Sequence, residues 1–176
     1  MSGNASSQQP GTGTDTGTGT GSESAEPAIV LVEPQVTAVV RGVVPLAGLR
    51  DFFDASFRQL TGAVSRQQVA LIGPAFGLYH RPPGETTDLE VGFVTDRAVH
   101  PEGDVVVSAL PAARVARTVH RGSFDGLGDS WERLRAWVRE QGLTPGDVMW
   151  EFYVTEPTPD MDPRDLRTEL NCVIAD

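Results

Sequence analysis

The spacing of apolar residues predicts two amphipathic helices. Leu46, Leu49, Phe53, Phe57 and Leu60 recur every three or four positions, which places them on one face of a helix. Pro45 is a favourable first residue for this helix, and Gly62 is a suitable end. A second series follows at the same spacing, and it consists of Leu127, Trp131, Leu134 and Val138. We expect Ser123 or Asp125 to cap this helix and Gly142 to close it.

Runs of β-branched and apolar residues predict strands between and around the two helices. The expected strands are 28–44, with a break at Pro34, then 77–81, 88–95, 104–109, 114–120, 148–154 and 167–175. We expect 144–147 to form a turn and 156–165 to form a loop, because both are rich in Pro, Asp or Gly. The order strand, helix, strand, strand therefore occurs twice. It predicts an α+β fold of two pseudo-twofold-related β-α-β-β repeats, which form one antiparallel sheet with two main helices on one face. A ligand groove is expected between the halves.

The first 27 residues differ from the remainder of the chain. They are Gly, Thr and Ser-rich, and beyond Met1 they contain no large apolar residue. We interpret 1–27 as a disordered tail and 28–176 as one domain, because such a tail buries too little apolar surface to offset the entropy of ordering it. It lacks the pattern of a secretory signal, and nothing downstream approaches the length of a membrane span.

Charge and cysteine content narrow the class of protein. The formal net charge is −10, which disfavours binding to the phosphate backbone of nucleic acids. Cys172 is the single cysteine, so no intrachain disulfide can form, and a buried core position is expected for it. A cytoplasmic location without membrane association is the simplest expectation.

Glu151 is the most unusual residue of the predicted strands. It interrupts the apolar and aromatic run VMWEFYV at 148–154, although acidic residues are depleted in strands. A buried carboxylate is costly unless a partner compensates it, so a chain that retains one can use it for cation binding or proton transfer. Alternation places Met149, Glu151 and Tyr153 on one face. If that face is solvated, Glu151 is an ordinary surface residue.

Short motifs in a fixed order resemble those of the GyrI-like small-molecule-binding domain, which is also the effector-binding half of some AraC-type and MerR-type regulators. The matching stretches are GPAFGLYH at 73–80, DLEVG at 88–92, LPAA at 110–113, HRGSFD at 120–125, Trp131 and Trp137, WEFY at 150–153 and TEL at 168–170. The resemblance covers about 36–174. It implies a pocket for bulky, often cationic, aromatic compounds.

The resemblance also implies site residues. The key acid of the family maps to Glu151, with Tyr153 beside it, and a second acid maps to Glu169. Aromatic pocket walls map to Tyr79, Trp131 and Phe124. The sequence departs from the family at Phe124, where many members have Tyr, and no DNA-reading segment precedes the domain, so direct action on DNA is not expected.

Each of these residues also has a structural interpretation. Trp131, at helical spacing, is either a core residue or a pocket wall. Glu169 either binds a ligand or pairs with Arg167 or another arginine. Tyr79 and Tyr153 are ordinary strand residues by propensity. His80 and His120 are expected at the surface. The histidines show no metal-ligand spacing, and no metal or cofactor is expected.

Three functions remain open from the sequence. The first is a binding protein for bulky aromatic or cationic molecules, in sensing or sequestration. The second is a hydrolase that detoxifies cyclopropane-bearing genotoxic natural products, with Glu151 and Glu169 as catalytic acids. The third is a gyrase-inhibitor-like protein, whose acidic surface contacts gyrase.

Overall fold

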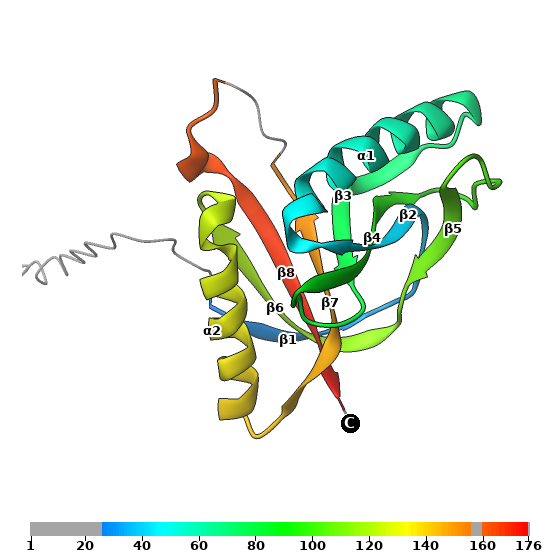
Figure 1. The fold of residues 1–176 in the computed structure, drawn as a ribbon. Helices are drawn as coiled ribbons and strands as arrows, with labels where there is room; N and C mark the ends of the chain where they lie inside the picture. Colours follow the sequence, from blue (N-terminus) through cyan, green and yellow to red (C-terminus); the bar gives the residue numbers. More distant parts are fainter. Residues whose placement is uncertain (1–25, 156–159, 176) are drawn as a thin grey trace, which may run out of the picture.

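The computed structural model describes residues 26–155 and 160–175, and it shows an α+β fold with eight strands and two main helices among them (Figure 1). The strands are β1 (Ala28–Val32), β2 (Gln35–Pro45), β3 (Leu71–Tyr79), β4 (Thr86–Thr95), β5 (Val105–Leu110), β6 (Ala113–Arg121), β7 (Thr144–Tyr153) and β8 (Arg167–Ala175). The helices are α1 (Leu49–Arg66) and α2 (Leu127–Glu140), and short 3-10 turns are η1 (Leu46–Gly48), η2 (Phe124–Gly126) and η3 (Pro163–Asp165). The predicted tail falls almost entirely outside the described residues.

All eight strands form one antiparallel sheet in the order β1-β6-β8-β7-β3-β4-β2-β5. The element order β2-α1-β3-β4 is followed by β6-α2-β7-β8, so strand, helix, strand, strand occurs twice, as the sequence predicts. The two units meet where β3 pairs with β7, at the middle of the sheet. The predicted pseudo-twofold relation between the units stays a prediction.

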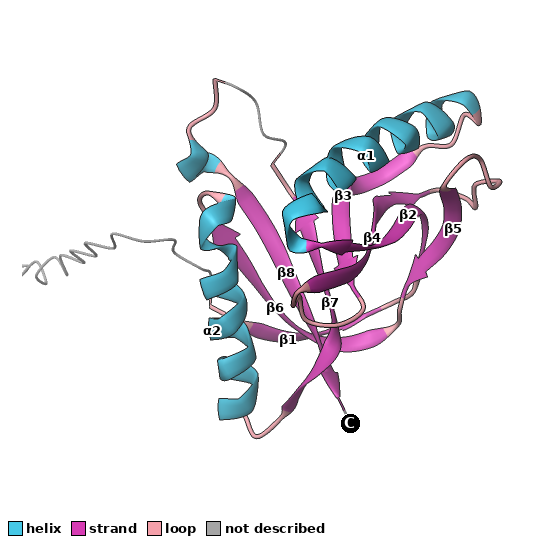
Figure 2. Cartoon of the chain, viewed as in Figure 1, coloured by secondary structure: helices cyan, strands magenta, loops and turns pink. Residues whose placement is uncertain are grey.

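The two helices pack over different parts of the sheet, as the cartoon in Figure 2 illustrates. α1 contacts β2 and β4, whereas α2 contacts β6, β7 and β8. On this helix-facing side, strand residues such as Tyr79, Met149 and Leu170 are buried together with Leu60 of α1 and Trp131 of α2. A second, smaller core occupies the other side and is centred on Phe76, Leu78 and Trp150. Every central strand therefore has two distinct faces, and this decides which polar residues can meet.

Several local predictions are wrong. α1 does not end at Gly62 but continues to Arg66, and Gln68 takes the left-handed conformation that terminates it, with φ of 54°. Residues 144–147 do not form a turn. They begin β7, with a register shift against β8 that lies between Pro145 and Met149.

The predicted end of α2 is confirmed, but its predicted capping residue is not. Gly142 follows the helix with φ of +78°, as predicted. At the start, Gly126 precedes Leu127 and no side chain caps the helix, because η2 already supplies a turn of backbone there. Within the described residues, no helix is both long and apolar enough to cross a membrane.

Candidate functional site

Glu151 lies in the middle of β7, on the side of the sheet that faces the helices. Its register partners are Gly77 on β3 and Leu170 on β8. The residue is only 4% exposed, so it is not the ordinary surface residue that the sequence left open. No cation among the described residues offsets this burial, so the environment of the carboxyl disfavours its charge.

Two tyrosines connect to this carboxyl through a directed chain of hydrogen bonds. The Tyr153 hydroxyl donates to the Tyr79 hydroxyl, which in turn donates to Glu151. Burial is the main cause that raises the pKa of both hydroxyls well above the ordinary range, and the charge of Glu151 adds to it. Both hydroxyls therefore remain protonated and act as donors at neutral pH.

The pKa of the Glu151 carboxyl lies close to neutral pH. Burial raises the pKa of Glu151 to about 7, and the Tyr79 hydroxyl and the Trp131 indole oppose that increase. Oε2 is buried and has no hydrogen-bond partner among the described residues. Buried polar atoms without partners are uncommon in native proteins, so this oxygen has unused capacity to accept a hydrogen bond or to face a cation.

Trp131 brings α2 to the same carboxyl. The residue is 7% exposed and belongs to the helix-side core. Its indole lies close enough to lower the pKa of Glu151, yet Nε1 has no hydrogen bond of acceptable geometry within the described chain. The N–H therefore lies near the carboxyl without a well-aligned hydrogen bond to it. Trp131 is thus both a core residue and a neighbour of the site.

Aromatic rings form a wall beside Tyr153. Phe53 of α1 and Phe124 of η2 make edge contacts with the Tyr153 ring, at centroid distances of 6.1 and 6.0 Å. Phe57 continues the wall, at 6.0 Å from Phe53 and 5.5 Å from Phe93. Phe124 is 42% exposed, so the wall reaches solvent at that end. The resemblance predicts Phe124 as a wall residue, whereas the periodicity predicts Phe53 and Phe57 only as part of the apolar face of a helix. The spacing of four residues between Phe53 and Phe57 is the signal that places both on one side of α1.

Gly77 makes room for the tyrosine chain. A Cβ atom at this position would lie 2.9 Å from the Tyr153 hydroxyl and 3.3 Å from Cζ of Phe53. Because Gly77 pairs with Glu151, the missing side chain lets the Tyr153 hydroxyl approach the sheet next to the carboxyl.

Glu169 is not brought together with Glu151. It is the register partner of Phe152, and successive strand residues face opposite sides, so Glu169 points away from the helices. Arg117 lies 3.2 Å from its Oε1, and Asn171 donates to the same oxygen at 3.2 Å. The two acids that the resemblance assigns to a ligand site therefore lie on opposite faces of the sheet. Pairing with an arginine, one of the two interpretations of Glu169 left open by the sequence, describes its surroundings.

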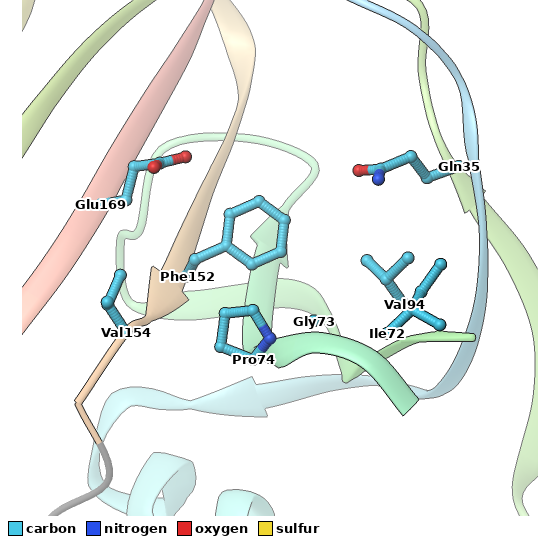
Figure 3. A pocket seen from close by; sticks show the side chains of 8 residues that line it. All are labelled: Gln35, Ile72, Gly73, Pro74, Val94, Phe152, Val154 and Glu169. Atoms are coloured by element: carbon cyan, nitrogen blue, oxygen red, sulfur yellow. The ribbon is translucent and has the colours of Figure 1, made fainter. Parts of the chain in front are cut away.

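A separate cavity of about 350 Å³ opens on this second face, next to Glu169. Figure 3 shows Glu169 and Gln35 on opposite sides of it, with Phe152 and Pro74 between them. Ile72, Gly73, Val94 and Val154 complete the lining. Glu151 does not line this cavity, which lacks the buried unpaired carboxyl and the tyrosine chain. We therefore locate the candidate site at Glu151.

His120 is not the surface group that the sequence predicts. It is fully buried, with Nδ1 2.7 Å from the Ser130 hydroxyl and Nε2 2.8 Å from the Ser123 carbonyl oxygen. A carbonyl only accepts, so Nε2 carries a hydrogen. Arg133 also donates to Ser130, at 3.1 Å. This network joins the end of β6, the turn before Phe124 and the first turns of α2, and it thereby supports the aromatic wall.

His80 lies half-buried at the end of β3. Its Nε2 is 2.8 Å from Oε2 of Glu90. The same nitrogen has no well-aligned hydrogen bond among the described residues, so the two side chains lie close together without a defined hydrogen bond. Cys172 is buried and free, as expected.

Comparison with solved structures shows the same fold in several proteins. The C-terminal domain of EcmrR is 20% identical, with a TM-score of 0.74, over 85% of this chain and 97% of that one. In a complex of EcmrR with DNA, the match has a TM-score of 0.73 at 21% identity and spans only 57% of that longer chain. SAV2435, solved with tetraphenylphosphonium, is 12% identical, with a TM-score of 0.62 over 86% of this chain and 94% of that one.

A hydrolase from Listeria innocua also shares the fold, with 13% identity, a TM-score of 0.61 and coverage of 85% of this chain and 92% of that one. No curated protein matches the chain. The family model of the GyrI-like small molecule binding domain matches residues 25–171. With this match over most of the chain and the fold that accompanies it, the protein belongs to the GyrI-like small-molecule-binding family.

Proposed function

We propose that this protein binds bulky aromatic cations in the groove between α1 and α2, with Glu151 as the counter-charge, in a cytoplasmic sensing or sequestration role. The observation that carries the proposal is the buried Glu151 carboxyl, which has one oxygen without a partner among the described residues.

The physical argument rests on the cost of that carboxyl. Burial opposes the ionisation of this carboxyl, and no described cation offsets that effect. A lipophilic cation would supply the missing charge without bringing water into the site. A neutral ligand of the same shape would leave an ionised carboxylate unpaired, which penalises it.

The aromatic wall complements a cation in a second way. The faces of Phe53, Phe124 and Tyr153 can attract positive charge through their ring quadrupoles, by about 0.5–2 kcal/mol for each contact. Such rings also bury the apolar surface of the ligand. SAV2435, which shares the fold, was solved with the aromatic cation tetraphenylphosphonium, and this supports the same ligand class here.

Titration calorimetry with tetraphenylphosphonium tests the proposal. The wild-type protein should bind, and Glu151→Gln should weaken binding at least about tenfold, because the substitution removes the charge and preserves the shape. Glu169→Gln is the matched control, since it removes a carboxylate from the opposite face and should leave affinity within about twofold. Equal losses in the two variants, or no binding by the wild type, would reject the assignment.

A second candidate function, hydrolysis of a strained electrophilic ring, is favoured by the titration of Glu151. A carboxyl with a pKa of about 7 can take a proton from water near neutral pH. In this scheme the water oxygen attacks a ring carbon, a ring C–C bond breaks, and the electron pair moves to a conjugated carbonyl oxygen. The proton that Glu151 removes from the water would pass through the Tyr79 hydroxyl to that oxygen, so the carboxyl and the tyrosine both return to their starting states.

Mass spectrometry separates this function from simple binding. A cyclopropane-bearing aromatic dienone incubated with the protein should gain the mass of one water, at a rate that falls in Glu151→Gln but not in Glu169→Gln. Recovery of unaltered compound after hours at stoichiometric protein would discard hydrolysis. A gyrase partnership stays a prediction from sequence, and it would appear as suppressed supercoiling by the wild type and Glu151→Gln alike.

A further inference from the structure

The cavity beside Glu169 lies where the two units of the sheet separate. β3 pairs with β7 only from Phe76 to Tyr79, so residues 71–75 of β3 have no register partner on β7 among the described residues. A register shift against β4 falls in the same stretch, and Pro74 within it has no N–H to donate to a neighbouring strand. The seam between β3 and β7 therefore opens, and the cavity of about 350 Å³ occupies this opening.

A two-stranded ribbon encloses the same face of the sheet. The pairing of β1 with β6 continues in the same register as the pairing of β2 with β5. Because β1 and β5 are the edge strands of the sheet, the ribbon connects both edges, and its residues Val39 and Val115 pack into the core on this face. The ribbon thereby brings Gln35 opposite Glu169 across the cavity (Figure 3). Walls built from paired strands are largely pre-formed, as small-molecule sites usually are.

The floor and the rim of this cavity are apolar. Phe152, Pro74 and Val94 line it, and Ile72 and Val154 beside them are 61% and 53% exposed. Large apolar side chains that remain exposed around a concavity are typical of binding sites. The volume lies at the small end of the range of about 300–1,000 Å³ for small-molecule sites, which suits a compound with one or two fused rings.

Two polar side chains point into the cavity from opposite sides (Figure 3). Within the described chain, both partners of the Glu169 carboxyl, Arg117 and Asn171, lie against Oε1, so Oε2 can accept a further hydrogen bond. The amide of Gln35 offers both a donor and an acceptor. A ligand that spans the cavity therefore meets a hydrogen-bond acceptor at one end and an amide at the other.

Arg117 decides which ligand charge this cavity favours. Its Nε lies 3.2 Å from Oε1 of Glu169 and donates to Oδ1 of the buried Asn171 at 2.8 Å. The carboxylate of Glu169 thus already has a cationic partner, unlike that of Glu151. A cationic ligand would place a second positive charge near the guanidinium, which penalises it. An uncharged donor such as a phenol hydroxyl satisfies Oε2 without that repulsion.

We propose that this cavity is a second binding site, for uncharged fused-ring aromatic compounds that carry a hydroxyl group at each end. One hydroxyl donates to Oε2 of Glu169, the other exchanges a hydrogen bond with the Gln35 amide, and the rings cover Phe152 and Pro74. The site lies on the face opposite Glu151, so it does not depend on cation binding there. Tetraphenylphosphonium has no hydrogen to donate to Oε2, so Glu169→Gln remains a control for its binding at Glu151.

Naphthalene-2,6-diol and 2-naphthol, which lacks one of the two hydroxyls, test the site. Both are uncharged at pH 7. Nuclear magnetic resonance titration of the isotope-labelled full chain should move the amide signals of Ile72, Gly73 and Val154. The diol should bind about fivefold more tightly than 2-naphthol, as one added hydrogen bond predicts. Equal affinities of the two probes, or shifts confined to the surroundings of Glu151, would overturn the proposal.

Three substitutions assign the contacts, and a fourth is the control. Gly73→Leu should weaken both probes at least about tenfold by filling the cavity, and a Cβ there would make only an ordinary 3.7 Å contact with Val94. Gln35→Met removes the amide and should equalise the two probes. Glu169→Gln should weaken both about fivefold, because an amide oxygen is a weaker acceptor than a carboxylate. Glu140→Gln, at an exposed position that ends α2, should leave both affinities within about twofold.

The same spectra establish that each variant folds. Unchanged affinity in Gly73→Leu, or equal losses in Glu140→Gln and Glu169→Gln, would mean that the probes bind elsewhere and would overturn the site. Neither result affects the proposed cation binding, which is measured separately with tetraphenylphosphonium and Glu151→Gln.

Discussion

The buried carboxyl of Glu151 should impose a measurable pH dependence on folding, which Glu151→Gln should remove. The substitution replaces the carboxyl with a neutral amide of nearly the same shape. It therefore isolates the titration of one group from that of every other group in the chain, because only the difference between the two proteins is interpreted.

The sign of this pH dependence follows from whether the folded or the unfolded chain holds the proton on Glu151. Between about pH 4.5 and 7 the carboxyl is ionised in the unfolded chain but protonated in the folded one, because burial raises its pKa from 4.5 to about 7. The folded state then binds more protons, so stability falls as pH rises through this window and levels off above it. At about 1.4 kcal/mol for each pH unit, the full window corresponds to roughly 3 kcal/mol, of which roughly 2–3 kcal/mol lies between pH 5 and 8.

Urea denaturation followed by far-ultraviolet circular dichroism measures this difference. The free energy of unfolding of Glu151→Gln, relative to the wild type, should increase by roughly 2–3 kcal/mol between pH 5 and 8. No ligand is present, so the measurement does not depend on any proposed function.

Parallel curves for the two proteins would refute the reasoning, because they would mean that Glu151 is solvated in the folded chain. An opposite trend, with the wild type gaining stability at high pH, would mean that a cationic group pairs with the carboxylate.

Three further predictions follow from the same geometry. The affinity for tetraphenylphosphonium should fall about tenfold for each pH unit below 7, because the cation competes with a proton on Glu151; calorimetry in buffers of different ionisation enthalpy should detect proton release near pH 6, and a flat profile would contradict this. Gly77→Ala should displace the Tyr153 hydroxyl, which would lie 2.9 Å from the new methyl group, so cation affinity should fall several-fold with a loss of stability below about 1.5 kcal/mol; unchanged affinity in calorimetry would show that the hydroxyl is not part of the site. His120→Leu removes both hydrogen bonds of the buried ring and leaves Ser130 without one partner, so urea denaturation should show a loss of about 2–4 kcal/mol; a loss below 0.5 kcal/mol would mean that the network does not hold α2.

Periodicity in the sequence was enough to predict the elements and their order. Apolar residues spaced by three and four identify both helices, and the β-branched runs identify the strands, because each pattern reflects the repeat of its own backbone geometry. The order strand, helix, strand, strand appeared twice, and the α+β class followed from it. Alternation alone also places Glu151 and Tyr153 on one face of the strand.

Local signals failed where tertiary contacts outweighed them. Pro145 and Gly146 have turn propensity, yet they begin β7, where the neighbouring β8 holds them in a shifted register. Gly62 has the character of a helix terminator, but α1 continues past it because Ala63 and Val64 pack into the core. The secondary-structure propensity of a single residue contributes about 1 kcal/mol or less to stability. Burial of neighbouring apolar side chains contributes more than this, so it overrides the propensity.

Local periodicity specifies which residues alternate along each strand, whereas the packing of strands and helices sets which face is buried and which residues meet across strands. Pairing of Glu151 with Leu170, rather than with Glu169 one position earlier, places the two acids on opposite faces, because a shift of one residue in strand register reverses every side chain. Burial of His120 likewise depends on Ser130 arriving from α2. These relations join positions far apart along the chain, and local periodicity carries no information about them.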